Sequence, residues 1–172
     1  MNMMSIGQSV RRGEAGRLLR GHGRYTDDVD ASRQARAFVL RSPYAHADIL
    51  AIDTSAADSA SGVLAILTGQ DLDNRGLGTL KPIMPSNRSD GSPGFVCTQP
   101  LLAQNRVRFV GEAVAFVVAE TVSQARDAAE MITVNYATLP AVVRVDDALS
   151  SDAIAIWEDN PGNEAFTHEV GN

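Results

Sequence analysis

Residues 107–136 constrain the fold of this chain more than any other segment. Residues 107–118 are apolar and rich in β-branched side chains, a pattern that predicts a strand. Thr121 stands where a helix N-cap is expected, and Gln124 follows three residues later to complete a capping box. Apolar residues then recur at helical spacing before β-type residues return at 132–136. The segment predicts a strand, an Ala-rich helix able to lie close to a sheet, and a second strand.

An earlier segment, residues 47–67, repeats this order. A strand is expected at its start, and Asp53 and Thr54 can cap a short helix that Gly62 ends before a further strand at 63–67. Two such units predict an α+β fold in which one layer of sheet is covered by helices. Each crossover should be right-handed if the strands it joins are parallel.

The rest of the chain divides around these units. Residues 1–34 are rich in Gly and Arg with little periodicity and predict an irregular arm. Residues 35–150 form the expected α+β domain, which begins with a strand at 35–41 and includes a long Gly/Pro loop at 73–105. Loops of that length are usually functional or contact something absent. Residues 141–149 look like a docked segment, 159–163 predict a turn, and a strand is expected to begin at Phe166.

Composition limits the classes of function. The chain has 172 residues, 44% of them hydrophobic and 21% charged, which is ordinary for a globular protein. Residues 1–41 contain eight arginines and four acidic residues, so they carry +4, and the total of −6 leaves −10 for the remainder. Such an arm can mark a nucleic-acid surface, but the interleaved aromatics of base stacking are missing, which favours pairing within the protein. A single cysteine and no signal peptide or membrane span predict a cytoplasmic protein without a disulfide.

No catalytic or metal-binding constellation emerges from the residues. His22, His46 and His168 are far apart in sequence, and no cysteine pair accompanies them. Cys97 has no basic activator nearby in sequence, which favours an incidental thiol. The adjacent carboxylates Asp27 and Asp28 fit the capping of a turn or pairing with an arginine better than acid–base catalysis.

Two residues, Gly111 and Glu112, interrupt the apolar pattern of the first strand expected in the 107–136 segment. Gly111 interrupts the apolar run, where a glycine usually marks a bulge or a close backbone approach. Glu112 is then either turned out of the strand by that bulge or buried and hydrogen-bonded to the backbone. Both interpretations remain open at this point. Trp157 is interpreted as a packing residue.

Several motifs occur in order along the chain: GHGRYTDD at 21–28, RSPYAHA at 41–47, GVLAILTG at 62–69, RVRFVGEAVA at 106–115, ETVSQA at 120–125, and NPGN at 160–163. Together they resemble the N-terminal α/β hammerhead domain of the molybdenum-binding large subunit in the xanthine dehydrogenase, aldehyde oxidase and carbon monoxide dehydrogenase family. Within these motifs we expect structural roles for six residues: Arg24, Tyr25, Asp27, Asp28, Gly111 and Glu112. The sequence around Tyr25 resembles the bacterial carbon-monoxide-dehydrogenase-like branch.

The resemblance implies an activity that this chain does not perform alone. Members hydroxylate an aldehyde, a purine or an N-heterocycle, or oxidise carbon monoxide, at a molybdopterin cofactor. Electrons leave through iron–sulfur clusters, usually to FAD, in partner subunits. The catalytic and cofactor-binding elements belong to the C-terminal region of the large subunit, so no catalytic, cofactor or metal residue carries over. Glu112 is not equated with the family's catalytic base, because its Val-Gly-Glu setting matches the hammerhead motif.

The implied partners are the remainder of the large subunit, the iron–sulfur small subunit and a flavin subunit, with no nucleic acid. Residues 151–172 would begin the linker to an absent catalytic domain, as expected for a piece of a longer protein. The alternative is a free-standing α+β ligand-binding or regulatory module, which the two strand–helix–strand units also permit.

Overall fold

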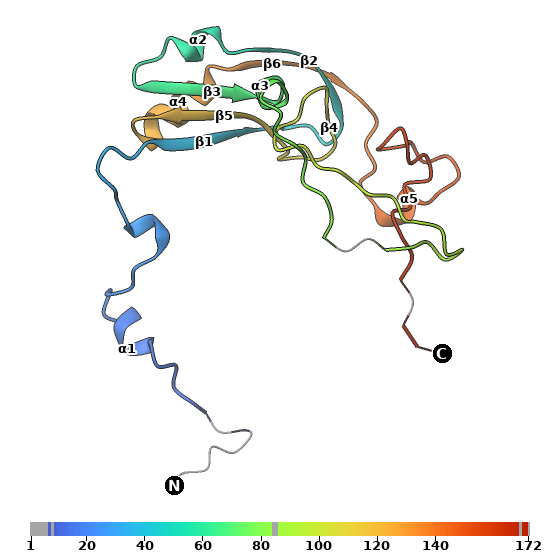
Figure 1. The fold of residues 1–172 in the computed structure, drawn as a ribbon, viewed down its shortest axis with the longest axis horizontal. Coiled ribbons are helices and arrows are strands. Elements are labelled where there is room, and N and C mark those ends of the chain that lie inside the picture. The colour runs from blue at the N-terminus through green and yellow to red at the C-terminus, as the bar shows by residue number, and fades with distance from the viewer. Residues whose placement is uncertain (1–6, 8, 84–85, 169, 172) are drawn as a thin grey trace. The chain divides into compact units, whose positions relative to one another are not determined.

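The computed structural model describes residues 7, 9–83, 86–168 and 170–171 and divides into two units, Met1–Gln34 and Ala35–Asn172. The first unit contains helix α1 (Ala15–Leu18) and the 3-10 helix η1 (Thr26–Asp28), and neither buries a residue. The second unit contains, in chain order, β1 (Arg36–Arg41), β2 (Ala47–Asp53), α2 (Ser55–Asp58), β3 (Val63–Thr68), α3 (Gly69–Asn74), β4 (Arg106–Val107), β5 (Ala113–Ala119), α4 (Val122–Glu130), β6 (Thr133–Thr138) and α5 (Val145–Ala148) (Figure 1). Among the described residues, no helix is long and apolar enough to cross a membrane.

The strands of the second unit form two three-stranded sheets, in the orders β1-β5-β3 and β4-β2-β6 (Figure 1). The mixed α and β class expected from the sequence is confirmed, but the single sheet is not what the structure shows. The two strands of each strand–helix–strand unit lie in different sheets, and each pairs with a strand of the other unit. All strand pairs within the described residues are antiparallel, so the rule on right-handed crossovers does not apply.

Chain lengths explain why the strands of one unit do not pair with each other. Parallel pairing needs a crossover of about a dozen residues or more, and residues 54–62 between β2 and β3 are fewer. In the other unit, β5 is a central strand with both edges taken by β1 and β3, so no edge is left for β6. Each unit therefore supplies one central strand and one edge strand.

Helix α4 packs on the first sheet through small side chains. Its N-cap is confirmed, because the Thr121 hydroxyl oxygen accepts a hydrogen bond from the Gln124 backbone N–H at 3.2 Å. The Thr121 hydroxyl in turn donates to Gln124 Oε1 at 2.8 Å. The buried core between this helix and the sheet consists mainly of alanines: Ala57, Ala115, Val117, Ala119, Ala125, Ala128, Ala129 and Ile132. The close approach expected from an Ala-rich helix face is confirmed.

A second, smaller core joins β2, β4 and β5, and contains Ala47, Ala103, Val107 and Val114. The strand expected at residues 107–118 is in fact two strands, because β4 ends at Val107 and a turn precedes β5. That turn lets β4 pair with β2 in one sheet while β5 pairs with β1 in the other. The apolar run therefore connects the two sheets.

The long Gly/Pro loop has no helix or strand among its described residues between Arg75 and Asn105, as the sequence predicts. It lies beside the C-terminal segment (Figure 1), where the Phe95 N–H donates to the Ala165 carbonyl at 2.7 Å. The prediction that a strand begins at Phe166 is wrong, because the described residues from 166 onward contain no strand. The segment is extended, but its bonds to the loop are too isolated to build a ladder, as with Thr167 N–H to the Asn87 carbonyl at 3.2 Å.

Candidate functional site

The six motif residues for which the sequence predicts structural roles belong to two different units. In the first, the Tyr25 backbone N–H donates to Asp28 Oδ2 at 2.8 Å at the start of η1. Asp28 therefore caps a turn, which is one of the two structural roles expected for the carboxylate pair. Arg24 and Asp27 are exposed in the same unit, while Gly111 and Glu112 lie in the second unit. The structure thus gives two local motifs, each with its own structural environment.

Glu112 is buried, with an exposed fraction of 4%. Its Oε2 accepts the Arg108 backbone N–H at 2.5 Å, and its own N–H donates to the Phe109 carbonyl at 3.2 Å. Of the two interpretations left open by the sequence, the buried, backbone-bonded carboxyl is confirmed. Burial raises the pKa of Glu112, and the Arg108 N–H and guanidinium oppose that rise. The carboxyl closes the turn between β4 and β5.

Gly111 adopts φ +88° in the same turn, a conformation that side chains with a Cβ rarely adopt. Its N–H donates to the Ser42 carbonyl at 2.8 Å, and its carbonyl accepts from Arg41 Nη1 at 2.8 Å. The Ser42 N–H in turn donates to the Glu112 carbonyl at 2.8 Å. These bonds tie the turn to the end of β1.

Charged side chains and one tryptophan interact around β4, and are here called the arginine cluster: Arg106, Arg108, Asp48, Trp157 and Glu158. Arg106 Nε lies 2.6 Å from Asp48 Oδ1, and Arg106 Nη1 lies 3.3 Å from Glu158 Oε1. The hydrogen bond from Arg106 lowers the pKa of Asp48. Arg108 Nε donates to the Ile156 carbonyl at 3.1 Å, and its guanidinium carbon lies 3.9 Å from the Trp157 ring centroid.

This cluster connects the second sheet to the C-terminal segment. Burial lowers the pKa of Arg108, opposed by the charge of Glu112. Each charged member has a partner of opposite sign or an aromatic face, so the arrangement stabilises structure more readily than it binds a new ion. The packing role expected for Trp157 is confirmed, since it also contacts Phe95 at a centroid distance of 6.1 Å. No local pattern in the sequence predicted the cluster, because its members come from separate segments.

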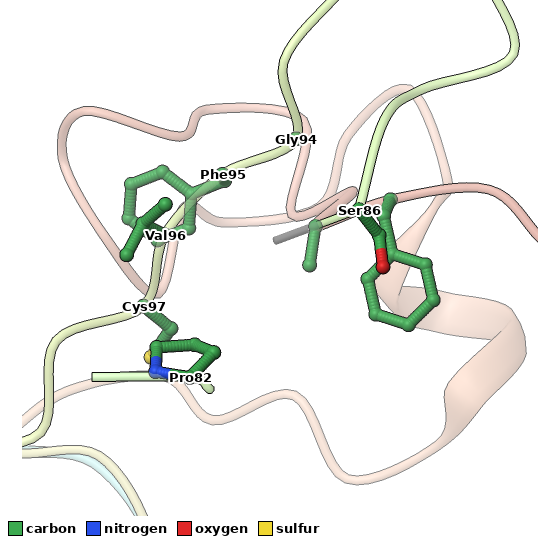
Figure 2. A pocket seen from close by; sticks show the side chains of 8 residues that line it. Pro82, Ser86, Gly94, Phe95, Val96 and Cys97 are labelled. Atoms are coloured by element: carbon green, nitrogen blue, oxygen red, sulfur yellow. The ribbon is translucent and has the colours of Figure 1, made fainter. Parts of the chain in front are cut away.

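A cavity of about 190 Å³ lies between the loop and the C-terminal segment (Figure 2). Its lining is Pro82, Ser86, Gly94, Phe95, Val96, Cys97, Ala165 and Phe166. Ser86 lies across the cavity from Cys97 in Figure 2. Burial raises the pKa of the Cys97 thiol, the opposite of what nucleophilic activation requires. The lining offers no base to either side chain, so the cavity does not resemble a catalytic centre.

Gly94 allows the backbone of this cavity wall to approach closely, a role that the sequence analysis missed. A Cβ at this position would lie 2.4 Å from the Ser86 carbonyl oxygen and 2.6 Å from that of Ala165. The Gly94 N–H donates to the same Ser86 carbonyl at 2.9 Å. The number of glycines in the loop was a visible signal, but nothing singled out this one.

The histidines do not converge within the described part of the chain. His46 is buried at the start of β2, with Nδ1 2.7 Å from the Pro140 carbonyl, while His22 and His168 are exposed. Among residues 7, 9–83, 86–168 and 170–171, no three His, Cys, Asp or Glu side chains are grouped so as to hold a metal ion.

Comparison with known proteins gives consistent matches across nearly the whole chain. The family model described as "Aldehyde oxidase and xanthine dehydrogenase, a/b hammerhead domain" matches residues 20–140. The nicotine 6-hydroxylase large subunit of Paenarthrobacter nicotinovorans is 37% identical over 159 residues, covering 91% of this chain and 19% of the relative. The carbon monoxide dehydrogenase large chain of Afipia carboxidovorans is 36% identical over 161 residues, covering 91% and 18%.

Solved structures agree. Quinoline 2-oxidoreductase from Pseudomonas putida 86 matches with a TM-score of 0.70 at 40% identity, covering 86% of this chain and 18% of that chain. Aldehyde oxidoreductase from Desulfovibrio gigas matches with a TM-score of 0.72 at 28% identity, covering 87% and 16%. This chain therefore spans about a fifth of the length of the relatives it matches.

Proposed function

We propose that this chain, which belongs to the a/b hammerhead domain family of aldehyde oxidases and xanthine dehydrogenases, is the non-catalytic N-terminal domain of a molybdenum hydroxylase large subunit. The observation that carries the proposal is the pairing of 37% identity over 91% of this chain with only 19% of a large subunit. In the full enzyme, the activity would be oxidative hydroxylation of an aldehyde, purine or N-heterocycle, or oxidation of carbon monoxide. The domain would act as a scaffold for the remainder of the subunit.

The residues of this chain do not fit the family's cofactors. Iron–sulfur clusters are typically held by four cysteines, and the whole chain has one. The apolar cavity near Cys97 offers few hydrogen-bonding groups for a pterin. We therefore assign molybdopterin to the remainder of the large subunit, and iron–sulfur clusters and FAD to partner subunits. No step of the reaction is assigned to a residue of this chain.

A structural role agrees with the way in which the polar side chains near β4 are used. The carboxyl of Glu112 is taken up by the Arg108 backbone, and Arg106 is paired with Asp48 and Glu158. These contacts link the second sheet, the turn before β5 and the C-terminal segment. Contacts of this kind hold parts of a domain together, as a scaffold role requires. We further propose a cytoplasmic location and no nucleic-acid partner.

A domain replacement tests the proposal. The matching segment of the quinoline 2-oxidoreductase chain is replaced by this chain, with the parent chain and a simple deletion of the segment as controls. The chimera should retain molybdenum and quinoline oxidation, while the deletion should lose both. Chimeric protein that is folded but lacks molybdenum would contradict the scaffold role.

The isolated chain provides the complementary test. Elemental analysis of the purified 172-residue protein should find neither molybdenum nor iron in stoichiometric amount. Stoichiometric molybdenum in the isolated chain would show that it carries a cofactor site of its own and would overturn the proposed division of roles.

A further inference from the structure

Resting on the proposed function, we propose that the segment around α5, residues 141–149, is a docking surface for the remainder of the large subunit. Three large apolar side chains of this segment are exposed: Val143 is 84% exposed, Val145 85% and Leu149 65%. Val145 and Leu149 are four residues apart across α5 and its C-cap, so they lie on one side of the helical turn. They form one apolar surface.

Other residues of the same segment face the rest of this chain. Val142 and Ala148 line a hollow together with Phe95, Ile156 and Trp157. Asn163 Nδ2 donates to the Ala148 carbonyl at 3.1 Å, which holds the end of α5 against the C-terminal segment. The segment therefore combines two apolar residues that are half-buried against the rest of this chain with three that are exposed.

Charged residues surround the exposed apolar side chains. Arg144 lies 3.6 Å from Asp146 and 3.9 Å from Asp147, and all three are exposed. An apolar centre with a polar, solvent-accessible edge is the usual composition of a protein–protein interface. Val143, Val145 and Leu149 are the large apolar residues of the segment that are exposed and do not line the hollow.

The length of the relatives favours the remainder of the large subunit as the occupant. The matches cover 91% of this chain but 18–19% of two large subunits, so about four fifths of each relative has no counterpart here. A second copy fits less well, because a two-fold interface places the same patch opposite itself. The patch holds two aspartates and one arginine in a chain of net charge −6, so a pair of copies would bring together two surfaces of the same net sign, which like-charge repulsion disfavours.

Hydroxyl-radical footprinting of the isolated chain and of the quinoline 2-oxidoreductase chimera tests the docking surface. Labelling of Val145 and Leu149 should fall about fivefold or more in the chimera. Leu64 on β3, which is 57% exposed, serves as the matched position on the first sheet. Labelling of Val145 and Leu149 that is equal in the two proteins would overturn the docking surface. Protection that appears in the isolated chain as its concentration rises would assign the surface to self-association and overturn it as well.

Variants separate this surface from the proposed function. The double variant Val145→Ser, Leu149→Ser should shorten the thermal inactivation half-life of the chimera about tenfold, whereas Leu64→Ser should leave it unchanged. The melting temperature of the isolated chain should not change in the double variant, since both side chains are exposed. A chimera without molybdenum sinks the proposed function, while an active chimera that tolerates the double variant sinks only the docking surface.

Discussion

Replacing Gly111 by valine should destabilise the chain through the backbone alone. Gly111 has φ +88°, and a Cβ built on it meets no heavy atom within 4 Å. A new side chain therefore finds open space, and its whole cost comes from holding a β-branched residue at positive φ. The strain also acts on the bonds that Gly111 exchanges with Ser42 and Arg41.

The expected loss for Gly111→Val is roughly 1–3 kcal/mol of unfolding free energy, the range for strained backbone positions. For a domain of this size, that is a drop of roughly 3–10 °C in melting temperature. Gly111→Asn should cost less, because asparagine tolerates positive φ better. Gly78→Val is the control, since Gly78 is equally uncrowded and its φ is not positive.

Urea unfolding of the isolated chain, followed by circular dichroism, measures these differences. The reasoning requires the order wild type, Gly111→Asn, Gly111→Val, with the control close to wild type. If Gly111→Val unfolds at the same urea concentration as wild type, the turn does not require positive φ in solution. If the control loses as much, the effect is not specific to the turn between β4 and β5.

Four further predictions concern the core, two carboxyl groups and local stability. Ala128→Leu should cost roughly 1–3 kcal/mol because Ala128 is fully buried on the sheet-facing side of α4, whereas Ser123→Leu on the exposed side of the helix should be near neutral; equal urea midpoints would mean that the space between helix and sheet can take a larger side chain. Burial raises the pKa of Glu112, so its stabilising contribution is present below the ordinary pKa of 4.5 and is lost as pH rises through the native pKa; Glu112→Gln should therefore gain stability relative to wild type as pH rises above 4.5. Asp48→Asn should show the opposite trend, because Arg106 lowers the pKa of Asp48 below 3.8, and this stabilisation is lost as pH falls; two parallel pH profiles would refute both assignments. Amide hydrogen exchange should be fast at residues 9–34 and in the described loop, and slow at 114–118 and 125–134; equal protection in a monomer would favour a self-sufficient module over an excised domain.

Local signals in the sequence predicted the elements because the physics that forms them is local. Thr121 caps α4 with its own hydroxyl, and Asp53 Oδ1 accepts the Ser55 N–H at 2.9 Å at the start of α2. Gly62 ends the α2 segment at φ +80°. Each of these signals lies within a few residues of the feature that it determines, so one sequence is enough to read it.

The partition into two sheets could not be read in the same way. It depends on which strand takes the open edges of β5 and β2, and those partners are far away in sequence. The apolar pattern of residues 107–118 does not distinguish one long strand from two strands joined by a turn. Gly111 indicated where the apolar run is interrupted. That the residues before it form a separate strand in the other sheet depends on the pairing of β4 with β2. Nearby residues determine where a strand forms, whereas residues far away in sequence determine which strand it pairs with.

The charged side chains from Arg106 to Glu112 are engaged in contacts within the domain. Arg106 is engaged by Asp48, Arg108 by Trp157 and the Ile156 carbonyl, and Glu112 by the Arg108 N–H. A catalytic acid, base or nucleophile must have a free reactive atom facing a substrate site, whereas each of these groups is held within the domain. The sequence shows that two arginines and a glutamate stand near a glycine, but not that the partners of the two arginines come from segments far away along the chain in both directions. The motif is explained by the connection it makes between two sheets and the C-terminal segment, which is the geometry a scaffold domain needs.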